Sequence, residues 1–116
     1  MPPRDWRMRI RDILDSIAKI ERYVEGMTFE MFSTSDITID AVVRNMEIIG
    51  EAASHVPADV QHRYPHVPWT EMRGMRNILA HEYFAVSLPI LWQTVTGNLP
   101  LVPPMLEAIL AAEETD

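Results

Sequence analysis

Residues 69–84 read WTEMRGMRNILAHEYF, and this stretch decides how the rest of the chain is interpreted. On an ideal helix, successive side chains are rotated by about 100°. One arc then carries the apolar side chains that an amphipathic helix buries, namely Met72, Met75, Ile78 and Leu79. The opposite arc carries polar side chains around the small Ala80, namely Arg73, Arg76, Asn77, His81 and Tyr83. Glu82 would point into the apolar arc, so we expect the regular helix to end near His81.

The polar arc combines groups that bind anions with groups that transfer protons. An arginine is a permanent, planar phosphate ligand, and a histidine exchanges its proton near neutral pH. The alternative is that the arginines are only solvated and that His81 complements the dipole at the end of its helix. The spacing alone leaves both interpretations open.

The order of these residues adds a second kind of information. Arg76 is followed directly by Asn77, then by His81 after four intervening residues, then by Tyr83. This pattern resembles the signature of the HEPN superfamily, and most closely its HepT-like branch, the toxin half of HepT/MNT toxin–antitoxin pairs. The upstream block RNMEIIGEA at residues 44–52 is similar too, and the resemblance covers roughly residues 8–110.

Cleavage of RNA without a metal needs a base for the 2′-hydroxyl proton, an acid for the leaving 5′-oxygen and a cation for the phosphorane. His81 can perform either proton transfer, and Arg76 can clamp the phosphate through two nitrogens. We expect Arg73 and Tyr83 to contact the substrate, and Asn77 either to contact it or to orient the imidazole. One chain supplies a single motif histidine, so a two-fold dimer with facing sites would supply both proton-transfer groups.

The resemblance implies the same assembly and adds a partner. HEPN proteins are known as dimers with a composite cleft, which would make this chain a metal-independent endoribonuclease that leaves a cyclic phosphate. HepT-like toxins pair with an MNT-type nucleotidyltransferase antitoxin, and the motif tyrosine, here Tyr83, would accept AMP from it. The antitoxin would otherwise act by steric blocking. The alternative function is a non-catalytic HEPN module that binds nucleotides or holds the substrate of a nucleotidyltransferase.

Composition narrows the class of protein. With 116 residues, 47% of them apolar, the chain is expected to form one domain, residues 1–116. The absence of cysteine fits a reducing cytosol, and the N-terminus does not resemble a signal peptide, so we expect a cytoplasmic protein. A net charge of −7 disfavours non-specific binding of nucleic acid, so RNA phosphates would need a local cluster of arginines. We expect no cofactor.

Residues 83–106 contain no charged side chain, so a membrane span has to be considered. Four prolines and several polar residues argue against it, namely Pro89, Pro100, Pro103, Pro104, Gln93, Thr94, Thr96 and Asn98. We expect no membrane, and infer that other protein covers this uncharged surface, which favours an oligomer.

The rest of the chain predicts an all-α, antiparallel bundle of four to five helices. The first helix should span residues 5–25 and stop at Gly26, and its apolar stripe comprises Ile10, Ile13, Leu14, Ile17, Ile20 and Val24. Arg4, Arg7, Arg9 and Arg11 give it a basic edge, which is either solvated or extends a phosphate-binding path. A second helix should begin at a Ser35 or Asp36 cap, end before Pro57 and bury Val42, Met46, Ile49, Ala53 and Val56.

Particular residues of the connections and later helices are also predicted. Phe29 and Phe32 should fill the core, and Gly50 should permit a close approach of two helices. Glu47 and Glu51 have no further ligand at metal-binding spacing, so we expect no metal site. His55, His62 and His66 are interpreted as surface residues, and residues 57–64 as one or two helical turns. Ser87 should cap a helix through Leu99 with Pro89 in its first turn, before a last helix to about Ala112.

Overall fold

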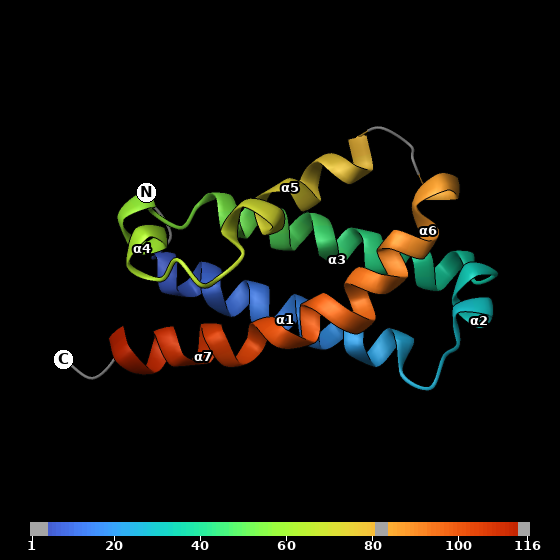
Figure 1. Cartoon of the computed structure of the whole chain (residues 1–116), viewed down its shortest axis with the longest axis horizontal. Helices are drawn as coiled ribbons and strands as arrows, with labels where there is room; N and C mark the ends of the chain where they lie inside the picture. Colours follow the sequence, from blue (N-terminus) through green and yellow to red (C-terminus); the bar gives the residue numbers. More distant parts are fainter. Residues whose placement is uncertain (1–4, 81–83, 114–116) are drawn as a thin grey trace.

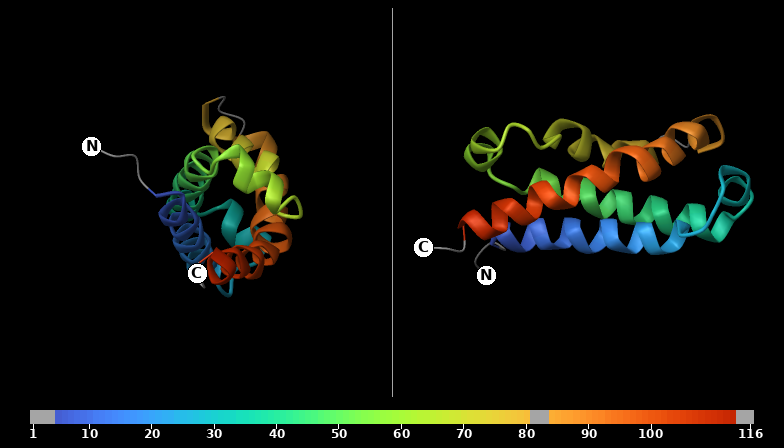
Figure 2. Two further views of the ribbon diagram at one scale, coloured as in Figure 1. Left: turned by 90° about the vertical axis from the view of Figure 1, so that its left-hand side faces the viewer. Right: turned by 60° about the horizontal axis from the view of Figure 1, so that its bottom comes forward.

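The computed structural model describes residues 5–80 and 84–113, with side chains described except at 77–80 and 84–87. Within these ranges every regular element is helical, which confirms the all-α class (Figure 1). The long helices run along a common axis, as the two views of Figure 2 show. Two short helices, α2 (Phe29–Ser33) and α4 (Ala58–Arg63), lie at opposite ends of the bundle.

The first helix, α1, spans Trp6–Val24, within one residue of each predicted end. The Asp5 side chain caps it by accepting a hydrogen bond from the backbone N–H of Arg7 at 2.9 Å. Gly26 follows the helix with φ of +75°, a left-handed conformation that glycine adopts without strain. Four side chains of the predicted apolar stripe are fully buried, namely Ile10, Ile13, Ile17 and Ile20.

Helix α3 spans Asp36–Ser54, antiparallel to α1 (Figure 1). Ser35 is its cap, since its Oγ accepts from the backbone N–H of Thr38 at 3.3 Å. The predicted stripe is buried along its length, namely Val42, Met46, Ile49, Ala53 and the following Val56. Asn45 is also buried, and its amide donates to the carbonyl of Ala41 at 2.9 Å.

The two phenylalanines of the α1–α3 connection differ in their packing. Phe32 is fully buried and its ring lies 5.1 Å from that of Trp92, measured between ring centroids. Phe29 contacts Trp92 edge-on at 6.3 Å but keeps 36% of its surface exposed. The prediction that both fill the core is therefore right for Phe32, while Phe29 only covers its margin.

The motif helix, α5, spans Trp69–Ala80 and packs antiparallel on α3 (Figures 1 and 2). Met72 and Met75 are buried, as the arc pattern predicted. Trp69 is also buried, and its indole donates to the carbonyl of Tyr64 at 2.9 Å. This contact ties the start of α5 to the end of α4.

The C-terminal part of the chain is a run of helical segments that differs from the prediction. Helix α6 spans Phe84–Gln93, so Ser87 does not cap it and Pro89 lies inside it. A proline at the sixth position removes one backbone hydrogen bond and brings its ring against the carbonyl of the residue four positions before it, which costs about 3 kcal/mol. A π-helical turn, Thr94–Asn98, and a 3-10 turn, Leu99–Leu101, then lead into α7, Val102–Glu113.

The prolines explain where this run departs from regular α-helix. Pro100 lies in the 3-10 turn, and Pro103 and Pro104 lie in the first turn of α7. Their missing N–H groups are tolerated there, because the N–H groups of a first turn are unpaired in any helix. Helix α7 then passes along α1 (Figure 2).

The stretch Leu88–Glu113, with a mean hydropathy of 1.2 in its most apolar window, is long and apolar enough to cross a membrane by length and composition alone. One side of it is buried in the common core, namely Leu91, Val95, Leu99, Val102, Leu106 and Ile109. That arrangement is typical of a core helix in a bundle. On other sides of the stretch Ile90 is 66% exposed and Leu101 is 62% exposed.

Candidate active site around Arg76

Helices α3 and α5 approach each other closely at Gly50. A Cβ added to Gly50 would lie 2.6 Å from the backbone nitrogen of Arg76 and 2.8 Å from its Cγ. Such distances are too short for any side chain, so the prediction that Gly50 permits a close helix approach is confirmed. The consequence is that the Arg76 side chain starts against α3 and extends along its surface.

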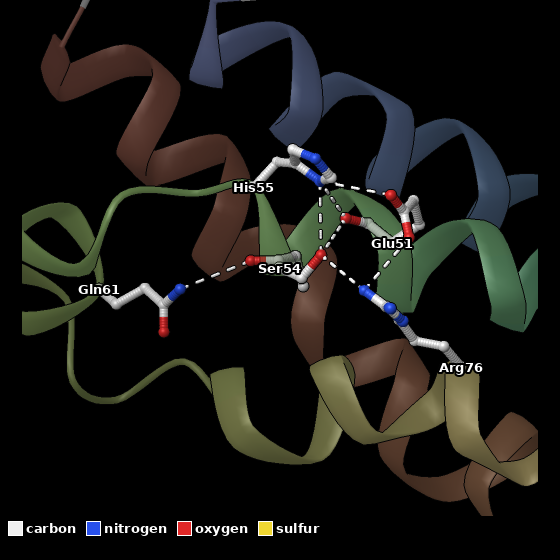
Figure 3. Close-up of polar contacts among 6 residues, drawn as sticks. Glu51, Ser54, His55, Gln61 and Arg76 are labelled. Carbon is white, nitrogen blue, oxygen red and sulfur yellow. Dashed lines mark hydrogen bonds and ion pairs between the residues drawn. The ribbon is translucent and has the colours of Figure 1, made fainter.

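The Arg76 guanidinium is anchored to the last turn of α3 (Figure 3). Its Nη1 lies 3.2 Å from Oε2 of Glu51 and donates to Oγ of Ser54 at 3.2 Å. The side chains of Arg76 and Glu51 are 47% and 52% exposed, so the pair is open to solvent. Ion pairs of this exposure contribute little to stability, and their effect is mainly to fix orientation.

His55 belongs to the same group of side chains, although the sequence suggested only a surface residue. Its Nδ1 lies 2.9 Å from the carbonyl oxygen of Glu51 and 3.6 Å from Oε1 of the Glu51 carboxylate. Because a carbonyl oxygen can only accept, this contact assigns a proton to Nδ1 and makes Nε2 the acceptor in the neutral ring. One carboxylate therefore bridges His55 and Arg76 (Figure 3).

A pocket of about 500 Å³ lies beside Arg76 between α1, α3 and α5. Its lining contains three arginines and three carboxylates, namely Arg9, Arg44, Arg76, Asp12, Glu47 and Glu51. Arg44 is paired with Glu47, whose Oε2 lies 3.4 Å from Nη1. Three helices thus bring guanidinium groups to one cavity.

Arg73 lies apart from this pocket. It donates from Nη1 to Oε1 of Gln61 and from Nη2 to Oγ1 of Thr70 at 3.2 Å. Gln61 in turn donates to the carbonyl of Val56 at 2.9 Å, which links α4 to the end of α3. Arg73 therefore braces α5 against α4, and within the described side chains it shares no pocket with Arg76.

The other predicted site residues are placed only in part. Asn77 lies on α5 next to Arg76, but its side chain is not among those described. His81 and Tyr83 lie outside the described residues. Their roles therefore stay predictions from the sequence.

Glu51, Ser54 and His55 are the site residues that sequence reasoning missed. A signal existed, since Glu51 and His55 are one helical turn apart, at the spacing where side chains of one helix meet. The link to Arg76 carried no local signal, because the two residues belong to different helices and meet only through the packing at Gly50.

These features define a small all-helical protein with an arginine-centred polar site at the contact of two helices. Residues 13–109 match the model of the family described as Ribonuclease HepT-like, and the chain belongs to this family. The resemblance inferred from residues 44–52 and 76–83 is thereby confirmed.

Relatives of similar length support this assignment. A protein of Methanocaldococcus jannaschii, provisionally named an RNase, is 36% identical over 95% of this chain and 91% of its own length. A second from the same organism, with the same kind of name, is 36% identical over 95% of both chains. A protein of Thermococcus cleftensis named probable ribonuclease HepT is 38% identical over 91% of this chain and 96% of its own. No solved structure shows significant similarity to the chain.

Proposed function

We propose that this protein is a metal-independent endoribonuclease and the toxin of a toxin–antitoxin pair. The observation that carries the proposal is the placement of Arg76, an exposed guanidinium held in one orientation by Glu51 and Ser54. Within the described residues its contacts with Glu51 and Ser54 involve Nη1, and we propose that Nη2 and Nε bind the substrate phosphate. Membership of the HepT-like family and the names of the relatives support RNA as that substrate.

The proposed reaction is transesterification at an RNA phosphate. One imidazole acts as a base and takes the proton of the 2′-hydroxyl, and the 2′-oxygen attacks phosphorus. The P–O5′ bond breaks as a second, protonated imidazole acts as an acid and gives its proton to O5′. The products are a 2′,3′-cyclic phosphate and a 5′-hydroxyl. Arg76 stabilises the negative charge on the oxygens of the pentacoordinate phosphorane, and His81 of each protomer performs one of the two proton transfers.

A homodimer follows from this division of roles, because one chain supplies one motif histidine. The exposed Ile90 and Leu101, on a stretch without charged side chains, support a surface covered by a second copy. The assembly works in the cytoplasm, in keeping with a chain that has no cysteine.

The proposed antitoxin is an MNT-type nucleotidyltransferase. Transfer of AMP to Tyr83 would add bulk and negative charge close to Arg76 in sequence and compete for its guanidinium. Steric occlusion by the antitoxin is the alternative route to the same silencing. Mass spectrometry of Tyr83 after co-expression with the nucleotidyltransferase distinguishes the two, since occlusion leaves the tyrosine unmodified.

The test of the nuclease is incubation of purified protein with RNA in EDTA, followed by analysis of the fragment ends. We expect cleavage with cyclic phosphate ends, and loss of cleavage by at least a hundredfold for His81→Ala and Arg76→Ala, since proton transfer and charge stabilisation each contribute about that much. His62→Ala, an exposed histidine of α4, is the matched control and should cut normally. A wild type that binds RNA without cutting it would show a binding module instead. A His81→Ala variant that cuts as well as the wild type would refute the catalytic role of His81.

A further inference from the structure

We propose that the pocket between α1, α3 and α5 binds the phosphate next to the scissile one, through Arg44 and Arg9. This inference rests on the proposed function in that it takes the substrate to be an RNA strand. It adds a subsite and two residues to the site around Arg76, and it gives the direction in which the strand leaves that site, along α3 toward Arg44.

Arginines gather at this pocket in an otherwise acidic chain, beside three carboxylates that balance their charge. The net charge is −7, and the chain contains 10 lysines and arginines, of which Arg9, Arg44 and Arg76 all line this one cavity. They come from α1, α3 and α5 respectively, so only the packed bundle brings them together. A strand of RNA needs such a local cluster, because the overall charge of the protein repels it.

The carboxylates in the pocket hold the arginines without using all of their donors. Oε2 of Glu47 lies 3.4 Å from Nη1 of Arg44, and Oε2 of Glu51 lies 3.2 Å from Nη1 of Arg76. In both pairs the carboxylate contacts Nη1, and a guanidinium has five N–H donors. Each arginine therefore keeps an edge that can donate to phosphate oxygens while its carboxylate fixes its position.

The spacing of the two arginine–glutamate pairs along α3 also suits a nucleic-acid strand, which carries one phosphate per nucleotide. Glu47 and Glu51 are four residues apart on α3, which separates their backbones by about 6 Å along the helix axis. Successive phosphates of a nucleic-acid strand are separated by a comparable distance. If Arg76 holds the scissile phosphate, Arg44 is placed for its neighbour.

Arg9 provides an independent observation at the same pocket. Its Nε is buried and has no hydrogen-bond acceptor among the described residues. A buried donor without an acceptor is costly and uncommon, and such groups often mark the place of an absent ligand or water. An anion in the pocket would supply acceptors to this guanidinium. Of the basic edge noted on the first helix, Arg9 is the residue that lines the pocket, whereas Arg7 pairs with Asp5 at 2.9 Å.

The test is binding of a fluorescein-labelled single-stranded RNA in EDTA, measured by fluorescence anisotropy over a range of salt concentrations. His81→Ala serves as the background, so that cleavage does not interfere. We expect Arg44→Ala and Arg9→Gln each to weaken binding about five- to tenfold, since a charged hydrogen-bond donor is lost. Each should also reduce the slope of log K against log salt concentration by about 0.7, the value for one phosphate contact on a single strand.

Arg22→Ala is the matched control, because it removes the same charge from an exposed position near the far end of α1. It should leave affinity and salt slope unchanged. Because Arg9 is partly buried, the fold of the Arg9→Gln variant is checked by circular dichroism. If that variant does not fold, the test rests on Arg44→Ala, since the Arg44 side chain is 69% exposed.

The outcomes separate this inference from the nuclease proposal. No detectable RNA binding, equal losses in the Arg22 and Arg44 variants, or no loss in the Arg44 variant would each overturn the pocket assignment. Binding that depends on Arg44, in a wild-type protein that cuts no RNA, would uphold the pocket and refute the nuclease. Cleavage of RNA by the wild type, together with unchanged binding in the Arg44→Ala variant, would support the nuclease proposal and refute the pocket assignment.

Discussion

Gly50 of α3 and Arg76 of α5 face each other where their helices pack closely, and the missing Cβ of Gly50 is what makes this contact possible. The next residue of α3, Glu51, is the one that pairs with the Arg76 guanidinium. Gly50, which permits the close packing, and Glu51, which holds the guanidinium, are thus adjacent in the chain. The geometry of the candidate site therefore depends on a residue that has no side chain.

Substitution of Gly50 by alanine should destabilise the protein and impair the site together. The added Cβ would meet backbone and Cγ atoms of Arg76 at 2.6 and 2.8 Å, so the helices have to move apart. Overpacking of this kind costs about 1–3 kcal/mol, partly offset by a gain of about 1 kcal/mol in helix propensity. We expect a net loss of up to about 2 kcal/mol in urea unfolding and a larger relative loss of RNA cleavage.

Gly74 provides the control for that substitution. It also lies in α5, but a Cβ built there meets nothing within 4 Å. Gly74→Ala should therefore stabilise the protein by about 0.5–1 kcal/mol and leave cleavage unchanged. If Gly50→Ala behaved like Gly74→Ala, the close approach of the helices would have no role.

The sequence predicted the parts of this fold that depend on local chemistry. The ends of α1 and α3 follow from Asp5, Ser35 and Gly26, whose side chains or backbone conformation act within a few residues. It failed where a local preference is overridden, as at Pro89 inside α6.

For the site, helical periodicity correctly placed Arg76 on the polar side of α5 but could not distinguish its surroundings from those of Arg73. The difference comes from other helices, since Gln61 of α4 holds Arg73 while Glu51 of α3 holds Arg76. Such contacts depend on how the helices pack, which no spacing within one helix encodes.

Glu51→Gln tests whether the carboxylate positions Arg76. The amide keeps the size of the side chain but loses the charge that attracts Nη1 of Arg76. We expect kcat for RNA cleavage to fall about tenfold, equivalent to about 1.4 kcal/mol of transition-state stabilisation, with little change in KM. Stability should change by less than about 1 kcal/mol, because the pair is exposed.

Glu21→Gln, an exposed carboxylate of α1, removes the same charge and should leave kcat unchanged. A faster Glu51→Gln enzyme would contradict this account, because it would mean that the carboxylate competes with phosphate for Arg76.

Tyr64 should make stability depend on pH in the alkaline range. Its hydroxyl donates to Oε2 of Glu113 at 2.9 Å, and Nη2 of Arg63 lies 2.9 Å from the other oxygen, which ties α4 to the end of α7. The hydrogen bond to Glu113, followed by burial and the negative charge, raises the pKa of Tyr64 above its usual value of 10.0. The folded state thus favours the neutral phenol, so this contribution is complete below pH 10 and is lost as the pH rises through the raised pKa.

Urea unfolding of the wild type and of Tyr64→Phe between pH 8 and pH 11 measures this dependence. Near pH 8 we expect the variant to be less stable by about 1 kcal/mol, the usual net value of a hydrogen bond. The difference should shrink above pH 10, where the phenol of the wild type ionises. A difference that stays constant across the range would show that the hydrogen bond does not control the titration.

Ile90→Glu tests the proposed dimer through the uncharged C-terminal stretch. Ile90 is 66% exposed in the single chain, and residues 83–106 carry no charge, so a glutamate there would place an unpaired carboxylate in an apolar interface. We expect self-association to weaken by at least a hundredfold in analytical ultracentrifugation, and cleavage to fall in parallel because the composite site needs two chains. Ile37→Glu, at a position 85% exposed in the first turn of α3, adds the same charge outside that stretch and should leave the dimer intact. A wild type that stays monomeric at high concentration would refute the dimer, whereas equal dimerisation of both variants would place its interface on another face.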